Sequence, residues 1–270
     1  FDGAADGVVF TALLNKVSKG TSVRYAYGTP NVQDNAANTA TQMSYSGIDN
    51  SSFENMKVTG LFLDQTIASL PFENLMQIYS VSAKDLNANS GMGTNDINVG
   101  DLSVNGFMFE ASKIGGSLDL FAHYSENEAK PNGKYMPYDM NGDGAVSAGE
   151  GMGLLSTNGM GYETKSGDAT WIGARYAVNK DWKIGAEWNK GSKNWFSFTS
   201  GANDPLNKLA TRGTATEVYV SKAVNKNANI RFGMVNIDYD YTGSGSHLSA
   251  PMEISAMTPM TGSTMTVEKT

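Results

Sequence analysis

The sequence ATWIGARYAVNKDWKIGAEWNK, residues 169–190, alternates apolar residues with charged or small ones on both sides of a short polar turn. From Trp182 to Trp188 every second residue is apolar, and the residues between them are charged or small. Because strand side chains point alternately to opposite faces, this two-residue period predicts β-strands and not helices. The link 179–181 is polar and short enough for a hairpin. The stretch therefore predicts two antiparallel strands, each with one apolar and one polar face.

The same pattern recurs along the chain. Ala177-Val178-Asn179-Lys180 returns as Ala223-Val224-Asn225-Lys226, and further short turns are expected near 19–20, 69–71 and 115–116. The long polar stretches fall between these hairpins, at about 28–54, 84–100, 126–168 and 190–213. Turns that alternate with long loops are typical of an up-and-down meander. We predict an all-β fold of about ten strands, an antiparallel up-and-down transmembrane β-barrel with short periplasmic turns and long extracellular loops.

Composition limits the other classes of protein. The 270 residues fit one domain, 1–270, in which the long external loop is 126–168. The formal charge of −7 argues against a nucleic-acid-binding protein, and the absence of cysteine excludes disulfides and thiolate metal sites. No apolar run approaches the ~18 residues of a membrane helix, whereas a barrel strand needs only about 9 to 11 residues. After Met234 the apolar residues move from even-numbered to odd-numbered positions. A bulge, or the edge of the membrane, is expected there.

The loop 126–168 contains one sharp chemical motif, DMNGDGAVSAGE at 139–150. It matches the twelve-residue calcium loop D-x-[DN]-x-[DN]-G-x5-E, whose oxygens surround a hard cation while the glycine provides the bend. The expected Ca²⁺ ligands are Asp139, Asn141, Asp143, the carbonyl of Ala145, Ser147 and Glu150. The flanks lack the helices of a sensor EF-hand, so we expect an ion that stabilises the loop. A regulatory or adhesive use of calcium, or a loop without an ion, stays open.

The polar faces of the predicted strands supply the candidate pore-lining residues: Arg24, Glu110, Asp119, His123, Arg175, Lys183, Glu187, Glu217 and Arg231. Both signs of charge are mixed among them, so no anion or cation preference is expected. A wide lumen and a plugged one are equally compatible with this set. No Gly-x-Ser-x-Gly elbow or ordered catalytic triad occurs, and we expect a protein that is not an enzyme.

The segment from Asn189 to Met252 resembles a family of uncharacterised outer-membrane porin-like proteins of Gram-negative bacteria, catalogued as a domain of unknown function. The likeness lies in GSKNWFSFT, NDPLNKLATRG and IDYDYTGSG. It implies a single-chain outer-membrane barrel, usually preceded by an N-terminal helical segment and closed by a strand with a terminal aromatic residue. The chain shows neither feature, so we expect a fragment of a longer barrel.

The expected function is an outer-membrane channel for passive diffusion of small hydrophilic solutes or ions, with a calcium-stabilised external loop. Its expected surroundings are membrane lipid and lipopolysaccharide, and a homo-oligomer is compatible with the pattern. Two alternatives stay open. The barrel could be a sheath around an electron-transfer partner, or the chain could be a calcium-stabilised surface β-sandwich adhesin, in which the apolar rows would face one another.

Overall fold

The computed structural model describes residues 5–30, 57–88, 97–139, 142–145, 147, 150–157, 161–197, 206–225 and 228–254. The expected ligand Asn141 lies outside these residues. Within them, no helix is long and apolar enough to cross a membrane.

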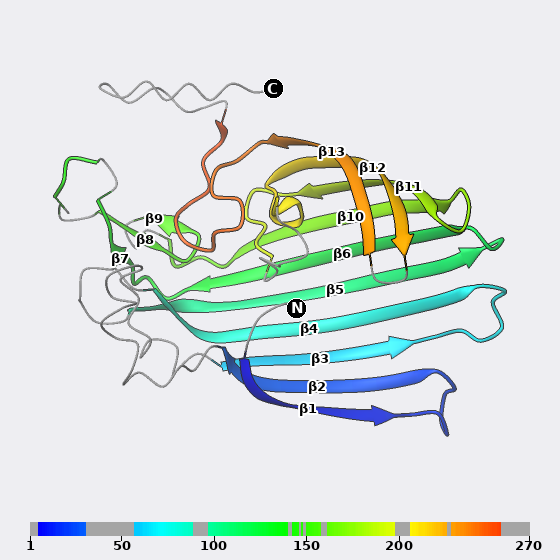
Figure 1. The fold of residues 1–270 in the computed structure, drawn as a ribbon. Helices are drawn as coiled ribbons and strands as arrows, with labels where there is room; N and C mark the ends of the chain where they lie inside the picture. Colours follow the sequence, from blue (N-terminus) through cyan, green and yellow to red (C-terminus); the bar gives the residue numbers. More distant parts are fainter. Residues whose placement is uncertain are drawn as a thin grey trace.

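One ten-stranded antiparallel sheet dominates the molecule (Figure 1). Each strand pairs with its neighbours in chain order, apart from three short strands that form a separate sheet between β6 and β10. The large sheet contains β1 (Ala5–Leu13), β2 (Thr21–Pro30), β3 (Lys57–Gln65), β4 (Glu73–Ala88), β5 (Ile97–Ile114), β6 (Leu118–Pro131), β10 (Lys165–Ala177), β11 (Trp182–Gly191), β12 (Gly213–Asn225) and β13 (Ala228–Tyr239). The small sheet contains β7 (Met136–Pro137), β8 (Gly151–Gly153) and β9 (Ser156–Thr157), and the short helix η2 is Lys208–Ala210. The predicted all-β meander of about ten strands is confirmed.

Short and long connections alternate strictly. The short ones are 14–20, 66–72, 115–117, 178–181 and 226–227, and the long ones are 31–56, 89–96, 132–164 and 192–212. Because successive strands are antiparallel, the strand ends joined by the short connections lie at one end of the sheet, and those joined by the long connections lie at the other (Figure 1). The hairpin predicted at residues 169–190 is β10–β11, with Ile172 opposite Trp188.

Two loops predicted from the sequence are too long. Strand β4 continues to Ala88 and β5 begins at Ile97, so the loop expected at 84–100 is 89–96. Strand β6 continues to Pro131 and β10 begins at Lys165, which shortens the loop expected at 126–168 to 132–164. Near the long loops the apolar and polar residues of these strands exchange faces. The strands continue past this exchange, so the sequence pattern did not reveal where they end.

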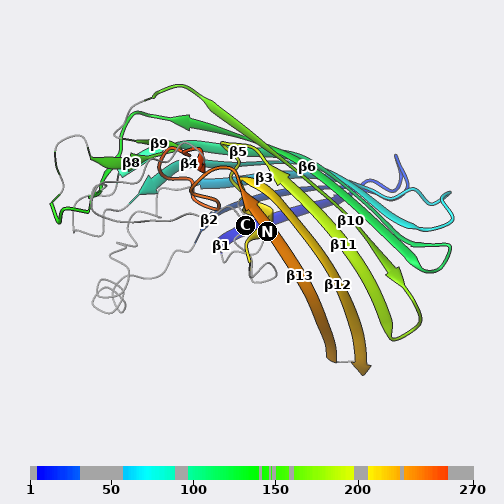
Figure 2. The ribbon, with the colours of Figure 1, turned by 90° about the horizontal axis from the view of Figure 1, so that it is seen from above.

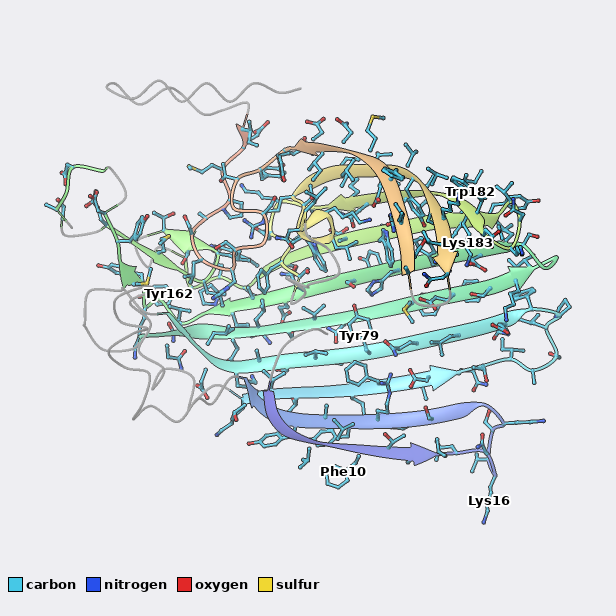
Figure 3. All side chains as sticks on the ribbon, in the orientation of Figure 1. Phe10, Lys16, Tyr79, Tyr162, Trp182 and Lys183 are labelled. Carbon is cyan, nitrogen blue, oxygen red and sulfur yellow. The ribbon has the colours of Figure 1, made fainter. Side chains whose placement is uncertain are left out.

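The cross-strand register defines two faces of the sheet, because directly opposed residues of paired strands point to the same side. The outer face carries the apolar rows of the sequence, and its large side chains are exposed: Val8, Phe10, Tyr25, Leu61, Ile78, Phe107, Leu120, Ile172, Ile184, Val218 and Phe232. Phe232 is 69% exposed and Ile184 is 49% exposed. The inner face carries Tyr79 and Lys183, which Figure 3 labels together with Phe10 and Trp182 of the outer face.

The sheet is curved, and Figure 2 shows β11–β13 turning away from the direction of β4–β6. On its inner face, at the end with the long connections, lies what we call the cap: the described residues of 132–157, 192–197, 206–212 and 240–254. Leu154, Leu155 and Phe196 of the cap pack against Leu102 and Ala129 of the sheet in the largest buried apolar cluster of the described residues. The core of the molecule therefore lies between the inner face and the cap.

The cap explains where the alternation changes its sense. In β6, the outer positions Glu126, Glu128 and Lys130 are charged, while Asn127 and Ala129 face inward and are fully buried. After Met234 the apolar residues Val235 and Ile237 occupy inner positions. The pairing of β12 with β13 runs on without a shift there, and its irregularity lies between Ala223 and Asn225 instead. The prediction of a bulge after Met234 is wrong.

Candidate functional site on the inner face

The register places all nine predicted polar residues on the inner face. Arg175 is opposite both Asp119 and Gly185, and Glu187 is opposite Glu217. Side chains from strands that are far apart in the sequence are thus brought onto one surface. That this surface lines a pore stays a prediction.

The most tightly held group on the inner face joins two acids and two bases. Glu187 and Glu217 are directly opposed and buried, at 9% and 8% exposed. The Lys208 ammonium of η2 lies 2.6 Å from Glu187 Oε2 and also binds Glu217, and the Arg231 guanidinium binds Glu217 and approaches Glu187 to 3.4 Å. Like charges opposed in a sheet repel, so the two glutamates need these cations.

Lys208 stays charged in this group. Burial lowers its pKa, but hydrogen bonds and charge from Glu187 and Glu217 outweigh that effect and raise the pKa above its ordinary value. Lys208 was not among the predicted site residues, because it lies in the polar loop between two strands and no periodicity marks it. The fold brings this loop back over the sheet, where the ammonium fastens η2 to β11 and β12.

Two further ion pairs lie on the inner face nearer the short turns. Arg24 donates to both oxygens of Asp64, from Nε at 2.9 Å and Nη2 at 3.1 Å, and Gln77 donates to the same carboxylate at 2.7 Å. Arg175 donates to Asp119 Oδ2 from two nitrogens, at 2.9 and 2.8 Å. Asp64 was missed in the sequence because the apolar alternation of β3 is short and its strand partner was uncertain.

An aromatic group occupies the middle of the inner face. The Tyr79 hydroxyl lies 2.7 Å from His123 Nε2 and 2.6 Å from Ser125 Oγ, and the latter two atoms are 3.1 Å apart. Gly106 is opposite Tyr79 in the sheet, and a Cβ there would lie 2.4 Å from the tyrosine ring. The glycine therefore lets the ring lie flat across β5 and point towards β6.

Arg212 fastens the segments of the cap to one another. Its side chain is fully buried, and it donates to the carbonyl oxygens of Trp195, Thr242 and Ser246 at 2.7 to 2.9 Å. Burial lowers its pKa to about 10, so the guanidinium is still charged at neutral pH. His247 lies close by, and burial together with the charge of Arg212 lowers the pKa of its imidazole to about 4, which keeps it neutral at pH 7.

The expected calcium loop is bent at its first half. Asp139 accepts backbone N–H bonds from Gly142 at 2.7 Å and from Gly144 at 2.8 Å, and both glycines have positive φ, +74° and +85°. Glu150 accepts the N–H of Ser147 at 2.8 Å. In the part of the chain that the structure describes, however, no three acidic or histidine side chains lie close enough together to hold a metal ion. Binding of Ca²⁺ by Asp139, Asp143 and Glu150 would therefore require these side chains to come closer together.

Comparison with known proteins identifies the family. Residues 10–270 match the family described as "Protein of unknown function (DUF3373)", and the chain belongs to it. No curated protein and no solved structure matches the chain. The resemblance to a family of unknown function is thereby confirmed, while its description does not name a porin.

Proposed function

We propose that the chain is an outer-membrane β-barrel protein whose inner face conducts small hydrophilic solutes or ions. The observation that supports this most directly is the reversed distribution of polar and apolar residues. Large apolar side chains such as Phe232 and Ile172 are exposed on the outer face, while Glu187 and Glu217 are buried on the inner face. A water-soluble β protein buries its apolar rows, whereas a membrane barrel exposes them to lipid.

The connections support the same proposal. Bacterial outer-membrane barrels have short periplasmic turns and long external loops. The strict alternation of short and long connections in this sheet fits that arrangement, with the cap and the calcium motif on the external side, next to lipopolysaccharide. Among the described residues, charged outer positions lie towards the strand ends, such as Glu126 and Lys130 near the long loops and Lys222 near the short turns, where the strands would leave the hydrocarbon.

The cap and the ion pairs favour a narrow passage over a wide one. The Lys208–Glu187–Glu217–Arg231 group and the apolar cluster under the cap occupy the inner face towards the long loops. Because both signs of charge lie along the remaining inner face, the proposed channel has small conductance and weak selectivity between anions and cations.

The β-sandwich adhesin is less well supported. It requires the apolar rows to face a second protein layer, and in the described residues the cap packs on the other, polar face. The sheath around an electron-transfer partner is an outcome of the test below.

The test uses the whole chain, refolded in detergent and then inserted in planar bilayers. We expect heat-modifiable migration on a detergent gel, and small, weakly selective conductance steps in the bilayer. A chain that is soluble and monomeric without detergent would contradict the membrane assignment. A heat-modifiable barrel that inserts but never conducts would contradict the channel and leave the sheath.

A further inference from the structure

A cavity of about 270 Å³ lies between the inner face and the Trp195 segment of the cap. Its walls are mainly apolar and aromatic, and they include Phe62, Val81, Val104, Met108, Trp171 and Trp195. Ligand cavities usually measure about 300 to 1,000 Å³, so this one suits a molecule with a single ring.

The aromatic walls of the cavity are fixed in place by their neighbours. Trp171 packs on Phe121 with ring centroids 4.6 Å apart, and its indole N–H points to Glu187 Oε2 at 3.3 Å. Trp195 donates its indole N–H to the Leu209 carbonyl at 2.8 Å. Tyr79 is held over Gly106 and lies 6.2 Å from the Phe62 ring centroid. A cavity with walls held in this way is preformed, which lowers the entropic cost of binding.

The main polar feature of the cavity is the triangle of Tyr79, His123 and Ser125. Each hydroxyl has one hydrogen, and a neutral imidazole Nε2 has one or none, depending on the tautomer. When Nε2 carries no hydrogen, both hydroxyl hydrogens are used inside the triangle; when Nε2 is protonated, it donates within the triangle and one hydroxyl hydrogen is left over. The hydroxyl oxygens keep lone pairs, so the triangle can accept a hydrogen bond from a ligand in either tautomer.

The charge of the walls restricts the ligand further. Among the described residues that line the cavity there is no aspartate, glutamate, lysine or arginine. Gln77 and Asn189 are the amide side chains in the walls, and each already donates to a neighbour, Asp64 Oδ1 and the Lys208 carbonyl. A charged ligand would lose its hydration here without gaining an opposite charge.

We infer that this cavity is a binding site for a small, uncharged, single-ring molecule that carries a hydroxyl donor, such as a phenol. The ring packs between Trp171 and Trp195, and the ligand hydroxyl donates to the Tyr79–Ser125 oxygens. The inference goes beyond the proposed channel. It rests on the cavity alone, and the expected binding is independent of whether the chain conducts.

The test is calorimetric titration of the whole chain in detergent with 4-methylphenol, toluene, benzoate and benzylamine, each corrected for partition into empty micelles. We expect saturable binding of 4-methylphenol, weaker binding of toluene, and none of the two charged compounds. Tyr79→Phe should weaken the binding of 4-methylphenol at least about fivefold, because the ligand hydroxyl loses an acceptor. It should leave the affinity for toluene unchanged. Val104→Phe should weaken both compounds, because the new ring fills the cavity.

Tyr25→Phe is the matched control, since Tyr25 is an exposed tyrosine of the outer face. It removes the same hydroxyl group and should alter neither affinity. Each variant is first checked for wild-type heat-modifiable migration and β-sheet circular dichroism. The inference is overturned if the wild-type chain releases no saturable heat with 4-methylphenol, if Tyr79→Phe binds it as tightly as wild type, or if benzoate or benzylamine competes equally well.

Discussion

Single residues decide how the cap is held on the sheet. Arg212 satisfies three carbonyl oxygens from two segments of the cap, those containing Trp195 and residues 242–246. A guanidinium can do this because its five N–H groups have a fixed planar arrangement. A buried carbonyl that loses its donor costs about 1 to 3 kcal/mol, so one side chain controls much of the stability of the cap.

Arg212→Met should therefore loosen the cap and leave the sheet intact. We expect the local free energy of unfolding of the cap to fall by on the order of 3 kcal/mol, since three buried carbonyls lose a donor. Limited proteolysis should cut the variant within 192–212 or 240–254, while its β-sheet circular dichroism is unchanged. Arg212→Lys should recover only part of the protection, because lysine cannot reach three acceptors in one plane. Equal protection of the Met variant and the wild-type chain would contradict the role of Arg212.

At the scale of elements, the strands have two zones that alternate in opposite senses. Near the short turns, apolar residues face outward and charged ones inward. In the part of β6 under the cap, the inner positions Ala129 and Asn127 are an apolar residue and a buried amide, and the outer ones are charged. The two zones differ because the inner face packs against the cap at the long-loop end, whereas it carries ion pairs nearer the short turns. The described parts of the connections 132–164 and 192–212 are therefore packing elements, and the first of these connections contains the calcium motif.

Calcium should order the segment 139–150. In the structure, Asp139 already folds the first half through Gly142 and Gly144, while Glu150 bonds to Ser147. Millimolar Ca²⁺ should draw Glu150 towards Asp139 and slow proteolysis between 132 and 164, with a Kd of about 10⁻⁴ to 10⁻³ M as in extracellular calcium modules. Mg²⁺ should protect less, because it requires a smaller octahedral site.

Asp139→Ala and Glu150→Ala should each abolish the calcium effect. Asp181→Ala, in the short turn between β10 and β11, removes the same charge from the other end of the sheet and should leave the effect in place. Identical digests with calcium and with a chelator would show that this loop takes no ion under these conditions.

At the scale of the whole molecule, the sheet presents a continuous apolar surface to its surroundings. Exposed contiguous apolar patches of more than a few hundred Å² are rare on soluble monomers. The outer face extends across all ten strands, and Figure 3 labels Phe10 of β1 and Trp182 of β11 on it. Such a surface needs lipid or another apolar partner. In the proposed membrane, the cost of placing a charge on this surface depends on its depth in the bilayer.

Ile172→Lys and Val178→Lys separate a membrane surface from an ordinary one. The two side chains are similarly exposed, 46% and 54%. Ile172 lies five residues before the end of β10, which is about 13 Å of height for a strand tilted by ~40°, whereas Val178 lies in the short turn. In lipid vesicles, urea unfolding should show a loss of about 2 to 4 kcal/mol for Ile172→Lys and about 0 to 1 kcal/mol for Val178→Lys. Small and equal losses, within about 0.5 kcal/mol, would contradict a lipid-facing outer surface.

The sequence by itself determined the strands, the order of the short turns and the face to which each charge belongs. It could do so because strand side chains alternate with a period of two, and this local rule holds wherever one face is apolar. All nine residues assigned from that rule, from Arg24 to Arg231, lie on one face. The rule failed at the ends of β4, β5, β6 and β10, where packing of the cap reverses the pattern.

Only the tertiary structure decided which residues meet on that face. Lys208 joins Glu187 and Glu217, Tyr79 joins His123 and Ser125, and Arg212 joins two loops, although nothing in the local sequence marks these partners. The physical reason is that loops have no fixed period. Their course over the sheet is set by long-range burial and hydrogen bonding, which a local pattern does not record.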